Sequence, residues 1–208
     1  MLGLFAKKVG MTQVFDEAGN LTPVTVMRVD PNVVIDQRTE EKDGYKAIIV
    51  GIDDAKKSRV TKPYAGQFPE NISPKKQLKE LRDFEKEVAV GDSLGVKVLE
   101  GVRYVDVSGV SKGKGFQGVV KRYGFGGGRK THGSKFHREP GSTGQSTYPH
   151  KTFKNVKLPG RMGREKVTVL SQRVVQMDAE KQLIWIKGAV PGINKGLVFV
   201  RAAVKKGR

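Results

Sequence analysis

The sequence has 208 residues, of which 37% are hydrophobic and none is cysteine, and its formal net charge is +18. This length provides one substantial core, the lack of an apolar run of about 18 residues excludes a membrane-spanning helix, and the lack of cysteine excludes disulfides and thiolate metal sites. The charge exceeds what solubility needs and favours a polyanion as partner. We therefore expect a soluble, cytoplasmic protein that binds nucleic acid, with neither a membrane nor a small-molecule substrate among its partners.

The residues before position 110 show the pattern of short β-strands. Apolar and polar residues alternate with period two, and turn-forming residues separate the runs. Strands are expected at 13–15, 24–29, 33–35, 47–52, 91–98 and 102–107. In the segment 63–84, Leu78, Leu81 and Phe84 fit a helix as well as a strand, so both remain open there.

The segment 111–166 departs from this pattern. It contains 14 Lys and Arg residues and two acidic ones, so it carries +12 of the total charge of +18. Between 123 and 164 the only Ile, Leu or Val residues are Val156 and Leu158. So little apolar surface does not offset the entropy of ordering many glycines. We predict a long, basic, Gly-rich arm that is ordered mainly when bound.

Strands are expected again after this arm, at 167–175, 183–186 and 197–204. Many short strands at this spacing favour a closed or nearly closed barrel, because closure removes unpaired edges. The sequence therefore predicts a mainly β protein with two domains. One is a discontinuous β-barrel body, residues 1–110 plus 167–208, and the other is an inserted RNA-binding arm, residues 111–166.

Glycines and lysines alternate at the start of the arm, in SKGKGFQG. A nucleotide-hydrolysing phosphate loop needs Gly-Lys-Ser/Thr opening a helix after a strand, and that spacing is absent here. Gly113, Gly115 and Gly118 instead allow close approach of the backbone to a phosphate chain. Phe116 between them adds a flat surface for an unstacked base.

The arm offers two further sets of candidate contacts, because charge interleaved with rings is typical of RNA binding. The candidates for phosphate contacts are Lys112, Lys114, Lys121, Arg122, Arg129, Lys130, Lys135, Arg138, Lys151, Lys154, Lys157, Arg161 and Arg164. The candidates for base stacking or for packing on the arm itself are Tyr123, Phe125, His132, Phe136, His137, Tyr148 and Phe153.

The decapeptide 141–150, GSTGQSTYPH, differs from the rest of the basic arm because it has no Lys, Arg, Asp or Glu. Uncharged residues gain little from phosphates, so we expect it to form the arm tip and to fit folded RNA by shape and hydrogen bonds. The tip residues are Gln145, Ser146, Thr147, Tyr148, Pro149 and His150. No carboxylate or thiol stands at ligand spacing from the three histidines, so neither a metal nor another cofactor is expected.

A series of motifs runs through the whole chain. The series is GLFAKKVGMTQVF, RVTKPYAGQF, LEGVRYVDVSGVSKGKGFQGVVKR, then THG, HREPGS and GQ in the arm, and finally GRMGREKVTV and IKGAVPG. In kind and in order these motifs resemble the bacterial ribosomal protein L-three family, the third protein of the large subunit. A single KGKG would mean little, whereas the ordered series is very specific.

The resemblance implies a barrel body related to that of translation factors and an arm that reaches through ribosomal RNA towards the peptidyl transferase centre. It also implies a structural protein, not an enzyme, that binds large-subunit rRNA near its 3′ end, nucleates early assembly and neighbours other large-subunit proteins. Many bacterial relatives carry a methylated Gln two residues beyond the Gln of GQ. Thr147 stands there in this chain, so methylation is not carried over to it.

From the residues alone, two other classes remain open. The charge also allows a free-standing nucleic-acid chaperone or an architectural DNA-binding protein. An RNA-modifying enzyme would need a cofactor pocket, and no Gly pattern of a dinucleotide or methyl-donor site follows a strand in the β half.

Overall fold

The computed structural model describes residues 1–206; residues 207 and 208, the end of the predicted body, lie outside the described residues. The chain divides into two compact units. The first, which we call the body, is Met1–Val110 with the residues from Lys166 onward, and the second, which we call the arm, is Ser111–Glu165. Among the described residues, no helix has the length and apolar character needed to cross a membrane.

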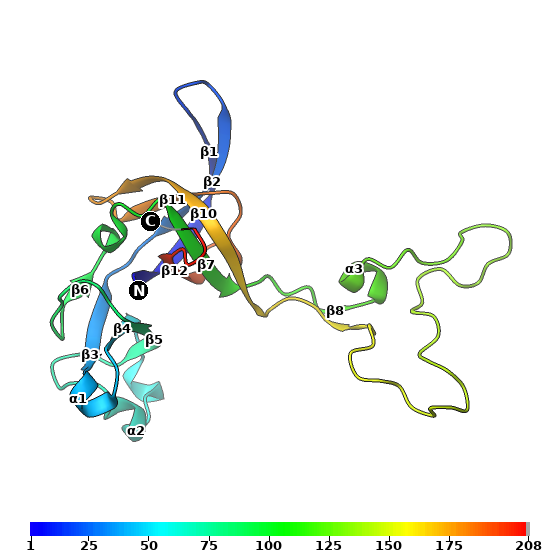
Figure 1. Ribbon diagram of the computed structural model, residues 1–208, viewed down its shortest axis with the longest axis horizontal. Coiled ribbons are helices and arrows are strands. Elements are labelled where there is room, and N and C mark those ends of the chain that lie inside the picture. Colours follow the sequence, from blue (N-terminus) through cyan, green and yellow to red (C-terminus); the bar gives the residue numbers. More distant parts are fainter. Residues whose placement is uncertain (207–208) are drawn as a thin grey trace. The chain divides into compact units, whose positions relative to one another are not determined.

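Six strands of the body form a closed ring (Figure 1). They are β1 (Gly3–Phe15), β2 (Leu21–Arg28), β7 (Tyr104–Val110), β10 (Lys166–Asp178), β11 (Leu183–Lys187) and β12 (Leu197–Ala202). The order around the ring is β1-β12-β7-β10-β11-β2, every neighbouring pair is antiparallel, and β2 pairs back onto β1. Strands from before and after the arm are therefore combined in one sheet, and no ring strand within this order lacks a neighbour.

A second sheet of the body has the order β5-β4-β3-β6. Its strands are β3 (Asn32–Arg38), β4 (Ala47–Asp54), β5 (Lys75–Arg82) and β6 (Ser93–Leu94). Short helical turns connect them: α1 (Glu40–Asp43), η1 (Lys57–Arg59), α2 (Lys62–Ala65) and η2 (Val96–Leu99). The prediction of a mainly β protein is confirmed, whereas the expected strand at 91–98 is wrong in its second half, because a 3-10 turn follows β6.

The open question at 63–84 is decided by pairing. β5 lies antiparallel to β4, from Ala47 opposite Arg82 to Asp54 opposite Lys75, and Leu81 is fully buried. Only the first residues of the segment form a helix, α2. Residues 75–82 form a strand because they pair with the edge of β4, a long-range contact that a sequence pattern does not reveal.

One continuous core serves both sheets. Leu4, Met27 and Ile184 of the ring are fully buried together with Val50 and Leu81 of the second sheet. Burial of one such aliphatic side chain contributes roughly 1.5–3 kcal/mol. The ring and the second sheet are thus parts of one cooperative body.

Buried polar groups also hold the two sheets together. The Asn32 side chain, fully buried, accepts a hydrogen bond from the Phe5 amide (2.8 Å) and donates to the Phe5 carbonyl (3.1 Å) and the Asp30 carbonyl (2.8 Å). These bonds satisfy the amide, which would otherwise be costly to bury. The start of β3 is thereby fixed to β1.

A candidate nucleic-acid interface

Two antiparallel segments form the base of the arm. The amide of Ser111 donates to the Glu165 carbonyl (2.9 Å), that of Lys114 to the Met162 carbonyl (2.9 Å), and that of Met162 to the Gly115 carbonyl (3.0 Å). The short strands β8 (Phe116–Gln117) and β9 (Gly160–Arg161) continue this ladder. Backbone hydrogen bonds therefore order a segment that has few apolar side chains to bury.

Glycines make this close pairing possible. At Gly163, where φ is +74°, an added Cβ would lie 2.1 Å from the Lys112 carbonyl oxygen, so the facing strand excludes any side chain. The three glycines predicted to approach a phosphate chain differ from Gly163, because no neighbouring atom excludes a side chain at them. An added Cβ at Gly113 would meet nothing nearer than 3.8 Å, and Gly115 and Gly118 have open space, although φ is +69° at Gly115. Open space beside exposed backbone leaves room for a ligand.

Helix α3 (Val119–Tyr123) follows the base and is fastened through Arg122. The guanidinium Nη1 donates to the Leu158 carbonyl at 2.7 Å. An added Cβ at Gly160 would lie 2.6 Å from that nitrogen, so glycine makes the room for it. Arg122, a predicted phosphate contact, is therefore half-buried and already holds two distant parts of the arm together.

Cations and rings gather around the same helix. The Arg122 guanidinium lies 5.0 Å and the Lys157 ammonium 5.9 Å from the centre of the Tyr123 ring, and the Phe125 ring centre lies 6.3 Å from that of Tyr123. Further along, the Lys151 ammonium lies 5.8 Å from the Phe153 ring centre. The structure thus brings four of the predicted contact residues into one cluster of charge and aromatic surface.

Other rings of the arm remain open to solvent. The exposed fractions of Tyr148, Phe116 and Phe153 are 86%, 73% and 59%. Phe116, on β8, is thus more exposed than most of the aromatic residues predicted to stack on bases. Exposed flat rings of this kind provide stacking platforms for unpaired bases.

Between α3 and β9, the described chain has neither helix nor strand. One turn in it is closed by a hydrogen bond from the Gly128 amide to the His137 carbonyl (3.0 Å), while His137 Nδ1 lies 3.0 Å from the Arg129 carbonyl oxygen. An added Cβ at Gly128 would lie 1.9 Å from the Phe136 carbonyl oxygen. This turn fixes the spacing of the cations at 129, 130, 135 and 138.

The predicted tip, residues 141–150, contains turns and bends but no regular element. Ser142 Oγ donates to the Gly144 carbonyl at 2.8 Å, and the Tyr148–Pro149 peptide is cis. All ten residues except Pro149 are exposed. The tip therefore presents backbone and neutral polar groups, not charge.

The electrostatics of the arm differ from those of the body. Every predicted phosphate contact except Arg122 is exposed, and within the described residues no Lys or Arg of the arm forms an ion pair. In the body, the Lys7 ammonium lies 2.8 Å from an Asp30 oxygen and 2.5 Å from an Asp53 oxygen. Hydrogen bonds to Asp30 and then to Asp53 raise the pKa of Lys7. The positive charge of the arm is therefore not balanced by carboxylates among the described residues and is available to an external partner.

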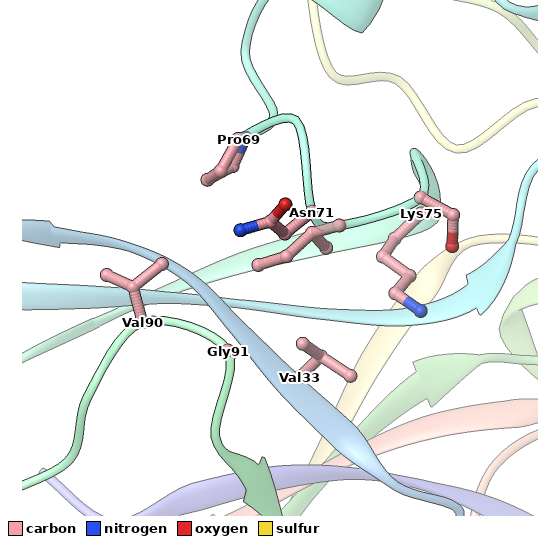
Figure 2. Close-up of a pocket in the computed structure, with 8 residues that line it drawn as sticks. Val33, Pro69, Asn71, Lys75, Val90 and Gly91 are labelled. Carbon is pink, nitrogen blue, oxygen red and sulfur yellow. The ribbon is translucent and has the colours of Figure 1, made fainter.

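A cavity in the body illustrates the contrast (Figure 2). It has a volume of about 310 Å³ and is lined by Val33, Asn71, Lys75 and Val90, among others. The ammonium of Lys75 lies 2.7 Å from an Asp54 oxygen, and Lys75 and then Ser73 lower the pKa of that carboxyl. The charge of Lys75 at this cavity is therefore already balanced by a carboxylate of the body. No cluster of three or more His, Cys, Asp or Glu suited to a metal occurs in the described part of the chain.

A mainly β body with an inserted segment of exposed cations that form no ion pair among the described residues is typical of a nucleic-acid-binding protein. The family model described as Ribosomal protein L3 matches residues 75–182. Large ribosomal subunit protein uL3 of Treponema pallidum (strain Nichols) is 58% identical over 208 residues, and that of Treponema denticola is 54% identical over 208 residues, each match covering both chains completely. The uL3 protein of Borrelia hermsii is 49% identical over 209 residues, again over the whole of both chains.

The chain belongs to the ribosomal protein L3 family. The resemblance seen in the motifs is therefore confirmed. The family consists of structural, non-enzymatic proteins of the large ribosomal subunit, so the prediction of a protein without catalytic activity is also confirmed. Family membership rules out the modifying enzyme and favours a large-subunit protein over a free-standing nucleic-acid chaperone or an architectural DNA-binding protein.

Proposed function

We propose that this structural large-subunit protein binds large-subunit rRNA chiefly through its arm. The observation that carries the proposal is the set of exposed cations in the arm that have no ion-pair partner among the described residues. Each cation that meets a phosphate releases condensed counterions, which is the main source of affinity for nucleic acid. The exposed rings Phe116, Tyr148 and Phe153 add stacking on unpaired bases.

We further propose a division of labour within the arm. Phosphate contacts position a protein on RNA without reading its sequence. The cations on both sides of the tip would therefore supply affinity, and the neutral tip, 141–150, would supply shape recognition. Gly113, Gly115 and Gly118 would let the backbone approach the sugar-phosphate chain where the arm begins.

The finer proposals follow the family resemblance. The ring would be a barrel of the translation-factor type, with domain limits at 1–110 plus 167–208 for the body and 111–166 for the arm. The rRNA site would lie near the 3′ end, binding would nucleate early assembly, and the tip would extend towards the peptidyl transferase centre as support. Neighbouring large-subunit proteins would be its protein partners, on the cytoplasmic ribosome.

The first experiment tests location and RNA preference with the full chain. A tagged chain is expressed in cells, and its sedimentation with large subunits is measured. In parallel, the purified chain is titrated with large-subunit rRNA and with length-matched duplex DNA at several salt concentrations. We expect nearly all of the protein to travel with large subunits and rRNA to bind more tightly. A free pool with equal affinity for DNA would contradict the proposal.

A second experiment separates the tip from its flanks. One variant replaces Gln145–His150 with Gly and Ser, and the matched variant changes Lys151, Lys154 and Lys157 to Ala. Subunit yield and peptidyl transfer per assembled subunit are measured for both. The tip variant should assemble and alter peptidyl transfer, whereas the lysine variant should lower the yield first. A tip variant that fails to assemble, yet translates normally per assembled subunit, would refute the division of labour.

A further inference from the structure

The hairpin of β1 and β2 continues beyond the ring. β1 pairs with β12 only over Gly3–Lys7, and β2 pairs with β11 only over Val24–Arg28. Residues 9–23, which we call the outer hairpin, lie beyond these pairings, and in the described structure β1 has β2 as its one strand partner from Gly10 to Phe15. Figure 1 shows this blue hairpin extending past the other ring strands. One side of β1 is therefore an open strand edge within the body.

The register shows which backbone groups face this edge. The Asp16 amide donates to the Asn20 carbonyl at 3.1 Å, so this pair, next to the turn, is hydrogen-bonded. Hydrogen-bonded and non-hydrogen-bonded pairs alternate along an antiparallel ladder, and the register runs without a shift from residue 15 back to residue 10. Met11, Gln13 and Phe15 therefore direct their N–H and C=O groups away from β2.

The opposite strand agrees with this assignment. Pro23 lies opposite Gln13, and its carbonyl turns outward to accept from the Gly188 amide at 2.9 Å. Proline has no amide to donate, so it suits a position whose N–H would face away from the partner strand. On the β2 side Pro23 is thereby occupied, whereas on the β1 side the outward backbone groups of Met11, Gln13 and Phe15 have no partner among the described residues.

The outward edge of β1 has no charged residue or proline over Met11–Phe15, and the nearest bulge lies before it, between Lys8 and Gly10. Proteins protect edges with lysine, proline, bulges or short strands. The edge strand β5 of the second sheet, KKQLKELR, carries such charges. Since one edge of this molecule is protected and the other is not, the unprotected edge is suited to pairing.

The same edge carries apolar side chains. The exposed fractions of Met11 and Phe15 are 53% and 62%, and that of Leu21, opposite Phe15, is 51%. Met11, Gln13 and Phe15 share one face, because alternate residues of a strand point the same way. An added strand would find both hydrogen-bonding groups and an apolar surface.

The charge of the outer hairpin indicates which kind of partner it can bind. Residues 9–27 contain no Lys or Arg, and the turn carries Asp16 and Glu17, in a chain with a net charge of +18. Hydrogen bonds from the Asn20 backbone and side chain lower the pKa of Asp16, with a smaller contribution from Arg173. Local negative charge repels phosphate and attracts a basic polypeptide.

We propose that residues 11–15 of β1 accept an extended segment of another large-subunit protein as an additional strand. The segment would place alternate apolar side chains on Met11 and Phe15 and a basic residue near Asp16 and Glu17. Main-chain hydrogen bonds would supply affinity and the side chains specificity, as in other cases of strand addition. The inference rests on the proposed function, because it takes the partner from the large subunit.

Photocrosslinking in assembled subunits identifies what covers the edge. The full chain is expressed with p-benzoylphenylalanine replacing Phe15, large subunits are purified, and crosslinked products are analysed. The control carries the same group in place of Thr12, which is exposed on the other face of the hairpin. We expect a crosslink to one basic protein from position 15 and a much weaker one from position 12. Crosslinks to rRNA or to a second copy of this chain overturn the inference.

Two variant pairs test strand addition itself. Gln13→Pro removes an outward amide and leaves the hairpin's own hydrogen bonds, whereas Gln13→Ala keeps that amide. Met11→Lys guards the edge with a charge that repels a basic segment, whereas Met11→Leu is neutral. Proline and lysine should each lower the crosslink yield from position 15 about tenfold, as expected for a lost hydrogen bond or a repulsive charge, and the controls should not.

The outcomes separate this inference from the proposed function. Thermal unfolding of each purified variant shows whether the body still folds. If Gln13→Pro prevents folding, Met11→Lys, at an exposed position, provides the test of strand addition. A chain that is absent from large subunits overturns both the proposed function and the inference. A chain that sediments with subunits but gives equal crosslink yields for Met11→Lys and Met11→Leu overturns the inference alone.

Discussion

The body and the arm are ordered by different forces. In the body, 23 of the described residues form one buried hydrophobic cluster, and cations such as Lys7 and Lys75 lie against carboxylates. In the arm, Val119 is the one buried hydrophobic residue among those described, and backbone bonds, glycine contacts and the Arg122 guanidinium hold the chain. The comparison indicates that the body is stabilised by its own hydrophobic core and ion pairs. The cations of the arm are not balanced by carboxylates of the chain and so are available to a polyanion.

The largest expected effect is on the body core. Ile184→Ala should lower the free energy of unfolding of the body by about 2–5 kcal/mol, because it removes a fully buried side chain and leaves a cavity. Val119→Ala, at the buried residue of the arm, should leave that unfolding transition unchanged. Denaturant unfolding of the full chain measures both. Equal shifts in the same transition would show that body and arm unfold as one unit.

The next effect is on RNA affinity. Changing Arg129, Lys130, Lys135 and Arg138 to Ala should lower the log–log salt slope of rRNA binding by about 3, since each lost phosphate contact removes roughly 0.7–0.9. Binding titrations at several salt concentrations measure it. A charge-matched control changes Lys42, Lys76, Lys97 and Lys181, four exposed lysines of the body. If the control lowers the slope as much, net charge and not the arm determines affinity.

A smaller effect should follow from opening the base of the arm. Gly163→Ala would place a Cβ against the Lys112 carbonyl at a positive φ, a strain of about 1–3 kcal/mol. Amide exchange of Lys114 and Met162 should accelerate, and rRNA binding should weaken, while body unfolding stays the same. Gly113→Ala is the control for amide exchange alone, because its added Cβ meets nothing nearer than 3.8 Å within the arm. Unchanged exchange in Gly163→Ala would show that the strands of the base are not closely held.

The smallest effect concerns a paired cation of the body. The pKa of Lys7 is raised by hydrogen bonds to Asp30 and then Asp53, so its stabilising contribution is present below the unfolded pKa and is lost as pH rises through the folded value. Thermal unfolding between pH 9 and about pH 12 should show this loss in the wild type, and Lys7→Met should lack it. The contribution should be about 1 kcal/mol or less. Lys130→Met in the arm should keep the wild-type pH dependence, and a flattened one would contradict the contrast.

Some structural features escaped the sequence pattern for identifiable reasons. β1 was expected only at 13–15 but begins at Gly3, because Leu4, Phe5 and Ala6 are buried in succession, so both faces of the strand are covered and no alternation appears. At 91–98, only Ser93–Leu94 finds a strand partner, at the start of β3. In both cases the deciding contacts come from residues distant in the chain.

The sequence by itself determined the family, the mainly β class and the segregation of charge, because motifs, period-two patterns and composition are local properties of the chain. The tertiary structure decided which strands close the ring, that β5 is a strand and not a helix, and which predicted contacts are free. Arg122 and His137 bond carbonyls of the arm, whereas Phe116 and Tyr148 stay exposed. The ring closure, the β5 pairing and the Arg122–Leu158 bond depend on residues that lie far apart in sequence and meet only when the chain folds.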